Sequence, residues 1–159
     1  DFMVKRPSDI TVFLNPCSLF LKTKTIDKAI EYFIKENLDS CCASQVAQTH
    51  CFYKNESINF NTNYRQPRSQ DLNPVHCMTS GFFIWKNKIF IENFENNSAA
   101  NFCGNFESYG VSNFEAIDID NNEDLYFAEK FLFQKEKDKQ IEYHPLVSDL
   151  IKDNLIQPN

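Results

Sequence analysis

Several features that would assign this sequence to a familiar class of protein are missing. The 159 residues contain no apolar run long enough to cross a membrane, and no signal-peptide pattern opens the chain. Basic residues are few, since 16 lysines and arginines stand against 22 aspartates and glutamates and leave a net charge of −6. Proteins that bind nucleic acids normally present a basic surface. We therefore expect a protein that binds neither nucleic acids nor membranes.

The sequence also has no CxxC pair, which excludes the usual zinc-ribbon and thiol-redox motifs. Four of the six cysteines are isolated, and only Cys41 and Cys42 are adjacent. The His-Cys pairs at positions 50–51 and 76–77 are weak candidates for a metal site. Because isolated thiols commonly behave as small buried apolar groups, we expect all six cysteines to be reduced and the protein to be cytoplasmic.

The chain does contain enough apolar material for one sizeable core. Hydrophobic residues make up 42% of the sequence, and 16 phenylalanines provide much of the packing volume. No internal repeat or low-complexity linker divides the chain, so residues 1–159 are expected to form a single domain. Strands are predicted at 9–14, 40–46, 81–85 and 114–119, and helices from Thr25 and at 88–94, 123–134 and 145–155. This alternation predicts an α/β fold with parallel strands.

Two aspartates form the most informative local pattern. Asp118 and Asp120 alternate with Ile117 and Ile119, so a strand would direct both carboxylates to one face. Neighbouring carboxylates repel each other unless a hard cation such as Mg²⁺ lies between them. The pattern therefore indicates either a Mg²⁺–phosphate site at the end of a sheet or a solvated strand end whose acids cap the following helix.

Four segments of the chain resemble, in order, motifs of the acylneuraminate cytidylyltransferases, the enzymes that make CMP-sialic acids. Residues 12–21 resemble the family's LLQPTSPLR segment, and residues 65–72 resemble its QPRQ.LP stretch. Residues 80–84 stand where the family has NGAIY, and residues 118–129 resemble its IDID…DL..AE motif. The resemblance covers about residues 9–131. It implies a three-layer α/β/α fold like that of nucleotide-diphospho-sugar transferases, with a mostly parallel sheet.

The resemblance implies transfer of CMP from CTP to the anomeric hydroxyl of a sialic-acid-like nonulosonic acid, with release of pyrophosphate. Asp118 and Asp120 would be the catalytic residues that hold Mg²⁺, which neutralises phosphate charge and lowers the pKa of the attacking hydroxyl. The residues that would bind the nucleotide or the acidic sugar are Asn15, Lys54, Arg68, Gln70 and Phe102. Residues 50–74 would form a dimerisation arm, so the enzyme would work as a homodimer.

Structural interpretations of the same residues stay open. Asn15 could be a turn residue before Pro16, Lys54 and Arg68 could be ordinary solvated charges, and Phe102 could be a core aromatic. The alternatives to the sialic-acid enzyme are a dimerising remnant without catalytic activity and a cytidylyltransferase for another acid, such as 3-deoxy-manno-octulosonate.

The chain departs from the family in two respects. It lacks the family's N-terminal glycine- and lysine-rich motif, which cradles the phosphates of CTP. It also has Met78, Thr79 and Ser80 where the family has RPN. Because the acidic pair and the flanking apolar pattern are intact, we expect the chain to be a piece of a longer enzyme rather than a degenerate protein.

Overall fold

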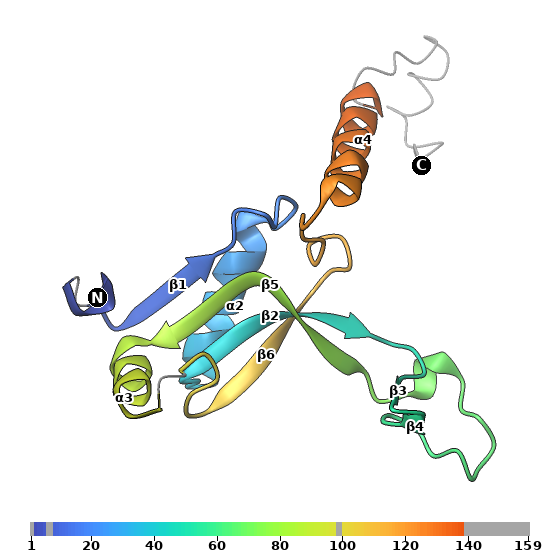
Figure 1. Ribbon diagram of the computed structural model, residues 1–159, viewed down its shortest axis with the longest axis horizontal. Coiled ribbons are helices and arrows are strands. Elements are labelled where there is room, and N and C mark those ends of the chain that lie inside the picture. The colour runs from blue at the N-terminus through green and yellow to red at the C-terminus, as the bar shows by residue number, and fades with distance from the viewer. Residues whose placement is uncertain (1, 6–7, 98–99, 139–159) are drawn as a thin grey trace, which may run out of the picture. The chain divides into compact units, whose positions relative to one another are not determined.

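The structure is a computed structural model that describes residues 2–5, 8–97 and 100–138. The chain forms two compact units, which divide between Ile119 and Asp120. The first unit contains a four-stranded sheet with its helices and a small hairpin (Figure 1). The second contains helix α4, Asn122–Asp138.

The four-stranded sheet has the strand order β1-β5-β2-β6 (Figure 1). Its strands are β1 (Ile10–Leu14), β2 (Ser40–Ala47), β5 (Val75–Lys86) and β6 (Phe106–Val111). β5 runs antiparallel to both β1 and β2, and only β2 and β6 are parallel. The fold is therefore mixed α/β, and the prediction of a mostly parallel sheet is wrong. A short apolar run such as β1 indicates a buried strand but does not reveal the direction of its neighbour.

The end of the sheet differs from the prediction for a chemical reason. The predicted strand at 114–119 does not form, and the strand in this region is β6, which ends at Val111. Ser112 then begins a single helical turn: its hydroxyl accepts the Glu115 N–H at 3.3 Å, and its carbonyl accepts the Ala116 N–H at 3.0 Å. This Ser-x-x-Glu pattern is a turn-forming signal that outweighs the apolar alternation after it.

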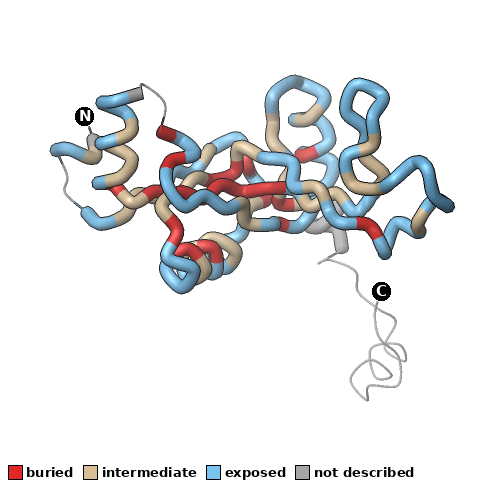
Figure 2. The backbone as a smooth tube through the Cα atoms, turned by 90° about the horizontal axis from the view of Figure 1, so that it is seen from below, coloured by how far each residue is buried: buried red, intermediate tan, exposed pale blue. Residues whose placement is uncertain are grey.

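Helix α2, Thr23–Lys35, packs on one face of the sheet and confirms the helix predicted from Thr25. Its buried residues Ala29 and Phe33 lie at helical spacing and face the strands. The strand and loop residues that complete this core are Leu38, Cys41, Ala43, Phe82, Ile84 and Val111. Figure 2 shows the buried residues as a continuous band along the strands, with a further group on one side of a helix.

Helix α3, Asn87–Asn97, confirms the helix predicted at 88–94 and lies against the opposite face. The rings of Phe90 and Trp85 are 4.9 Å apart, and Trp85 alternates with the core residue Ile84 along β5. Among the described residues, this face remains partly open, because Phe13 and Phe102 are about half exposed. A complete second helical layer is therefore not part of the structure described here.

Residues 50–74 form a small substructure at the far end of β2 and β5 (Figure 1). It contains a hairpin of β3 (Phe52–Tyr53) and β4 (Glu56–Ser57), followed by the 3₁₀ helix η1 (Ser69–Asp71). Asn59 joins its two ends, because its amide donates to the carbonyls of Thr49 at 2.8 Å and Asn73 at 3.0 Å. Whether this arm binds a second subunit stays a prediction.

The two terminal regions contain the remaining elements. Helix α1, Phe2–Lys5, is a single turn. Helix α4 confirms the helix predicted at 123–134, and the helix predicted at 145–155 lies outside the described residues. None of the described helices combines the length and the apolar character needed to cross a membrane.

Candidate functional site

Asn15 directly follows β1 and connects it to two other segments. Its N–H donates to the carbonyl of Gly81 at 3.1 Å, which extends the pairing of β1 with β5 by one residue. Its side-chain oxygen accepts the N–H of Cys17 at 3.1 Å and so forms the turn at Pro16. Its side-chain nitrogen donates to Asp118 Oδ2 at 3.4 Å. Asn15 is thus both a turn residue and a neighbour of the predicted catalytic carboxylate.

Ser80 reaches the same carboxylate from an irregular part of β5. The pairing of β5 with β2 shifts between Cys42 and Ser44, so the residues between Met78 and Phe83 lie opposite Ala43 alone. Such bulges redirect side chains and are common beside functional sites. The Ser80 hydroxyl donates a hydrogen bond to Asp118 Oδ2.

Ser80 was not among the site residues predicted from the sequence. The signal that could have found it was its position, because it stands where the family has asparagine, another hydrogen-bonding side chain.

Asp118 lies in a stretch without regular secondary structure and is half-buried. Its Oδ1 accepts the N–H of Ile119 at 3.1 Å, while Oδ2 accepts the bonds from Asn15 and Ser80. A carboxylate offers about four lone-pair directions, so Oδ1 keeps one direction for a further ligand. The Ile119 N–H also approaches the carbonyl of Cys17 at 3.2 Å, which holds this stretch beside the turn after β1.

Asp120 begins the second unit, and its side chain is exposed. Within the described residues, its carboxylate makes no hydrogen bond or ion pair. Its N–H donates to Asp124 Oδ2 at 3.1 Å, and Asn121 Oδ1 in return accepts the N–H groups of Glu123 at 2.8 Å and Asp124 at 3.1 Å. This reciprocal cap starts α4. The acid that caps α4 is therefore Asp124, and in the part of the chain that the structure describes neither Asp118 nor Asp120 does so through its side chain. A joint site of Asp118 and Asp120 stays a prediction.

The other predicted binding residues fall mainly in the arm. Lys54 is at the tip of the β3–β4 hairpin, with its ammonium group 5.3 Å from the centre of the Tyr53 ring. Arg68 forms an exposed ion pair with Asp71 through its Nε at 2.8 Å, and Gln70 lies exposed in η1. In the described part of the chain, no recorded contact joins these three residues to Asn15 or Asp118.

Phe102 lies on the partly open face of the sheet rather than in the core. Its ring centre is 5.1 Å from that of Phe106 and 6.4 Å from that of Phe83, and the side chain is 55% exposed. Phe102 is therefore not a buried core aromatic, and none of its ring contacts within the described part of the chain joins it to Asp118. A ring that remains exposed is available to a ligand or to another segment of protein.

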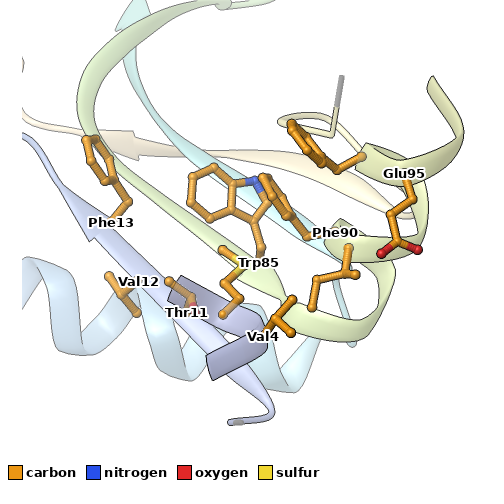
Figure 3. A pocket seen from close by; sticks show the side chains of 10 residues that line it. Val4, Thr11, Val12, Phe13, Trp85, Phe90 and Glu95 are labelled. Carbon is orange, nitrogen blue, oxygen red and sulfur yellow. The ribbon is translucent and has the colours of Figure 1, made fainter. Parts of the chain in front are cut away.

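A cavity of about 610 Å³ opens on this face beside β1 and α3 (Figure 3). Trp85 and Phe90 lie together at its centre, with Phe13 on one side and Glu95 on the other. Glu95 is the only charged residue among those that line it, and none of the predicted site residues does so. The cavity is therefore separate from the group formed by Asn15, Ser80 and Asp118.

The described residues contain no group of three or more histidine, cysteine, aspartate or glutamate side chains placed to hold a metal ion. Mg²⁺, however, commonly uses one or two carboxylates and completes its shell with water and substrate phosphates. The carboxylate of Asp118, with a free direction on Oδ1 and a hydroxyl beside it, has the hard oxygen chemistry that Mg²⁺ requires.

Comparison with known proteins does not extend this assignment. No protein-family model matches the chain, and no curated protein matches its sequence.

Proposed function

We propose that this chain is part of a nucleotidyltransferase that transfers CMP from CTP to a sialic-acid-like nonulosonic acid and releases pyrophosphate. The observation that supports this proposal is the convergence on Asp118. Asn15, Ser80 and Asp118 come from three separate segments that resemble three motifs of the cytidylyltransferases, and they share one carboxylate oxygen. Residues that converge in this way from distant positions are typical of a site rather than of unrelated surface groups.

In this proposal Asp118 and Asp120 hold Mg²⁺. Among the described residues, hydrogen bonds hold the carboxylate of Asp118 but not that of Asp120. Mg²⁺, when bound, neutralises the charge of the triphosphate and lowers the pKa of the attacking sugar hydroxyl. The Asn15 amide and the Ser80 hydroxyl both donate to Oδ2 of Asp118 and so restrain the carboxylate, while Oδ1 accepts only the N–H of Ile119 among the described residues. Precise orientation of this kind is how a protein tunes a metal ligand.

The acidic sugar is assigned to Lys54, Arg68, Gln70 and Phe102. Because the first three lie in the arm, they serve this role only if the arm reaches the site of a second subunit, so the proposal includes a homodimer. Arg68 uses its Nε and Nη2 atoms on Asp71, which leaves Nη1 for a sugar carboxylate. The half-exposed rings of Phe13 and Phe102 mark the face on which the second helical layer of a three-layer fold would lie.

The test is pyrophosphate release from CTP and Mg²⁺, measured with the full-length protein, a panel of nonulosonic acids and, separately, 3-deoxy-manno-octulosonate. Release that requires a sialic-acid-like acceptor supports the proposal, and release with 3-deoxy-manno-octulosonate alone identifies the other acid-activating enzyme. If the protein binds CTP but releases no pyrophosphate with any acceptor, it is the non-catalytic remnant. One observation favours that last candidate: Met78 is 57% exposed at the position where the family has an arginine.

A further inference from the structure

Glu115 is a buried acid that sequence analysis did not select. It is 5% exposed, and its carboxylate accepts hydrogen bonds from the start of α2 and from Ser112, which begins the turn that contains Glu115. Oε1 accepts the Thr25 hydroxyl at 2.5 Å and the N–H of Lys22 at 3.2 Å, while Oε2 accepts the Ser112 hydroxyl at 2.7 Å. One carboxylate thus joins the start of α2 to the turn after β6.

These two regions are the ones that lead to the candidate site. The start of α2 follows the Asn15 turn by a few residues, and the turn after β6 precedes Asp118 by a few residues. Two further contacts hold the same regions together: the rings of Phe20 and Phe114 lie 4.2 Å apart, and the Ile119 N–H reaches the Cys17 carbonyl. Of these ties, only the one made by Glu115 uses a charged group, whose carboxylate accepts directional hydrogen bonds from both regions.

The contacts also keep Glu115 charged. Burial raises the pKa of its carboxyl group, but the hydrogen bonds from Thr25 and Ser112, with the N–H and the charge of Lys22, outweigh this effect and lower the pKa. An ionised, buried carboxylate with its hydrogen bonds satisfied has a well-defined position, because each alternative position leaves a charge without partners.

We propose that Glu115 is a positioning residue, which places Asp118 against Asn15 and Ser80 by fixing the turn after β6 to the start of α2. Its effect on Mg²⁺ rests on the proposed function, whereas its effect on the position of Asp118 does not. Glu115 itself touches neither Asn15 nor Asp118 in any contact recorded among the described residues, so it acts through the chain between them.

The test compares Glu115→Ala with two variants. Glu115→Gln is the conservative one, because its oxygen can still accept from Lys22 and Thr25 and its nitrogen can donate to the Ser112 hydroxyl. Asp39→Ala is the matched control: Asp39 also joins two segments, accepting the Asn105 N–H and the Lys86 ammonium at 2.9 Å each, but at the other end of β1. If Glu115→Ala does not fold, Thr25→Val takes its place in the experiment, because it removes one hydrogen-bond donor to Glu115.

Two measurements are made on each folded variant: hydrogen exchange of the Ile119 amide by NMR, and Mg²⁺ affinity by calorimetric titration. We expect Glu115→Ala to speed exchange at Ile119 by about tenfold or more and to weaken Mg²⁺ binding by about tenfold. Glu115→Gln should restore both values. Asp39→Ala should lower the unfolding temperature and leave both values near those of the wild type.

The outcomes separate this inference from the proposed function. Exchange at Ile119 that is equally slow in Glu115→Ala and in Asp39→Ala overturns the positioning role, whatever the metal does. A wild-type protein that binds no Mg²⁺ overturns the proposed metal site, and the exchange rates then still decide the role of Glu115. Mg²⁺ binding that Asp118→Asn weakens but Glu115→Ala does not also counts against the inference and leaves the metal site intact.

Discussion

The side-chain nitrogen of Asn15 lies 3.4 Å from Asp118 Oδ2, although the two residues are 103 positions apart in the sequence. The contact joins the residue after β1 to the stretch that follows the turn at Ser112. Ser80 donates to the same oxygen from the bulged part of β5, so three segments meet at one carboxylate. Residues far apart in the sequence are thus brought together at one candidate site, whose proposed chemistry can be tested.

The first prediction concerns the charge of Asp118. If Asp118 holds Mg²⁺ as proposed, Asp118→Asn should reduce Mg²⁺-dependent turnover by at least about 100-fold, because it removes the charge of the ligand while an amide of the same shape keeps the fold. Asp120→Asn should have the same direction of effect. Steady-state kinetics over a range of Mg²⁺ concentrations, with circular dichroism as a check of folding, measures this.

Asp124→Asn is the control for these two variants. Asp124 caps α4 through two backbone N–H groups, and asparagine keeps an acceptor oxygen there but loses the charge near the helix N-terminus. Its substitution should therefore cost about 0.3–1 kcal/mol of stability without a change in Mg²⁺ dependence. An Asp118→Asn enzyme with the wild-type kcat at limiting Mg²⁺ would show that the metal assignment is wrong.

Much of the secondary structure could be predicted because it is encoded locally. The apolar run of β1 and the helical spacing of Ala29 and Phe33 in α2 specify these elements, and the structure confirms both. The direction of the strands could not be predicted, because it depends on which distant run each strand pairs with. Ile10 pairs with Lys86, and no local pattern in either segment indicates that partnership.

Of the residues that meet at the candidate site, the sequence pointed to two, and it did not reveal how they are held together. Asn15 and Asp118 were found from the sequence, but the strand expected to present Asp118 is replaced by the turn that Ser112 and Glu115 form. The contact of Ser80 depends on a change of register within β5, which side-chain periodicity cannot reveal.

The second prediction concerns the reactivity of the thiols. Cys17 and Cys77 are exposed, whereas Cys41 and Cys42 are buried, and burial raises the pKa of the Cys41 thiol to about 12. We expect iodoacetamide to modify Cys17 and Cys77 of the native protein at least about tenfold faster than Cys41, because the thiolate is the reactive form. Mass spectrometry of timed samples measures each site, and unfolding without reductant should expose all six thiols. A stoichiometric intrachain disulfide in that sample would contradict the prediction.

The third prediction concerns acid stability. The Asn105 N–H and the Lys86 ammonium hold the pKa of Asp39 below its ordinary value of 3.8, although burial opposes them. Because the folded pKa is the lower one, this stabilisation is complete above about pH 4 and is lost as the pH falls through the folded pKa. Asp39→Asn should therefore cost about 1–3 kcal/mol near neutral pH and progressively less in acid. Urea unfolding at a series of pH values tests this, and a difference that grows as the pH falls would reverse the assigned sign.

The fourth prediction separates the charge of Lys54 from its backbone conformation. Lys54 and Asn55 both have positive φ, of 48° and 68°, at the tip of the β3–β4 hairpin. Asparagine adopts this conformation more readily than lysine, so Lys54→Asn should keep or stabilise the turn while it removes the charge. If Lys54 binds the acidic sugar, the KM for the sugar should rise by about tenfold with little change in the KM for CTP.

Asn55→Gly is the matched control for Lys54→Asn, because glycine also accepts positive φ and leaves Lys54 in place. Equal KM values for the sugar in the wild type and in Lys54→Asn would remove Lys54 from the binding site. An equal rise in both variants would instead attribute the effect to the hairpin.

The last prediction concerns assembly through the arm. Four large apolar side chains of this segment are 55–76% exposed on the single chain: Phe52, Tyr53, Ile58 and Tyr64. Asn59 and the packing of Phe60 between His50 and Phe52 hold the arm in shape without covering them. An ordered segment that keeps aromatic rings exposed has the composition of an interface core, with the tyrosine hydroxyls suited to its rim. We therefore expect the intact protein to be a homodimer at micromolar concentration.

Substitution of Tyr53 and Tyr64 by aspartate should give a folded monomer, because both side chains are largely exposed and their replacement removes little internal packing. Ile34→Asp is the control, since Ile34 is 63% exposed on α2, away from the arm, and its substitution should leave the dimer intact. Deletion of residues 55–63 should likewise give a monomer. Both monomers should lose more affinity for the sugar than for CTP, because in the proposed homodimer the arm would carry Lys54 and Arg68 to the second subunit. Light scattering that shows the intact protein to be monomeric at micromolar concentration would exclude the shared site.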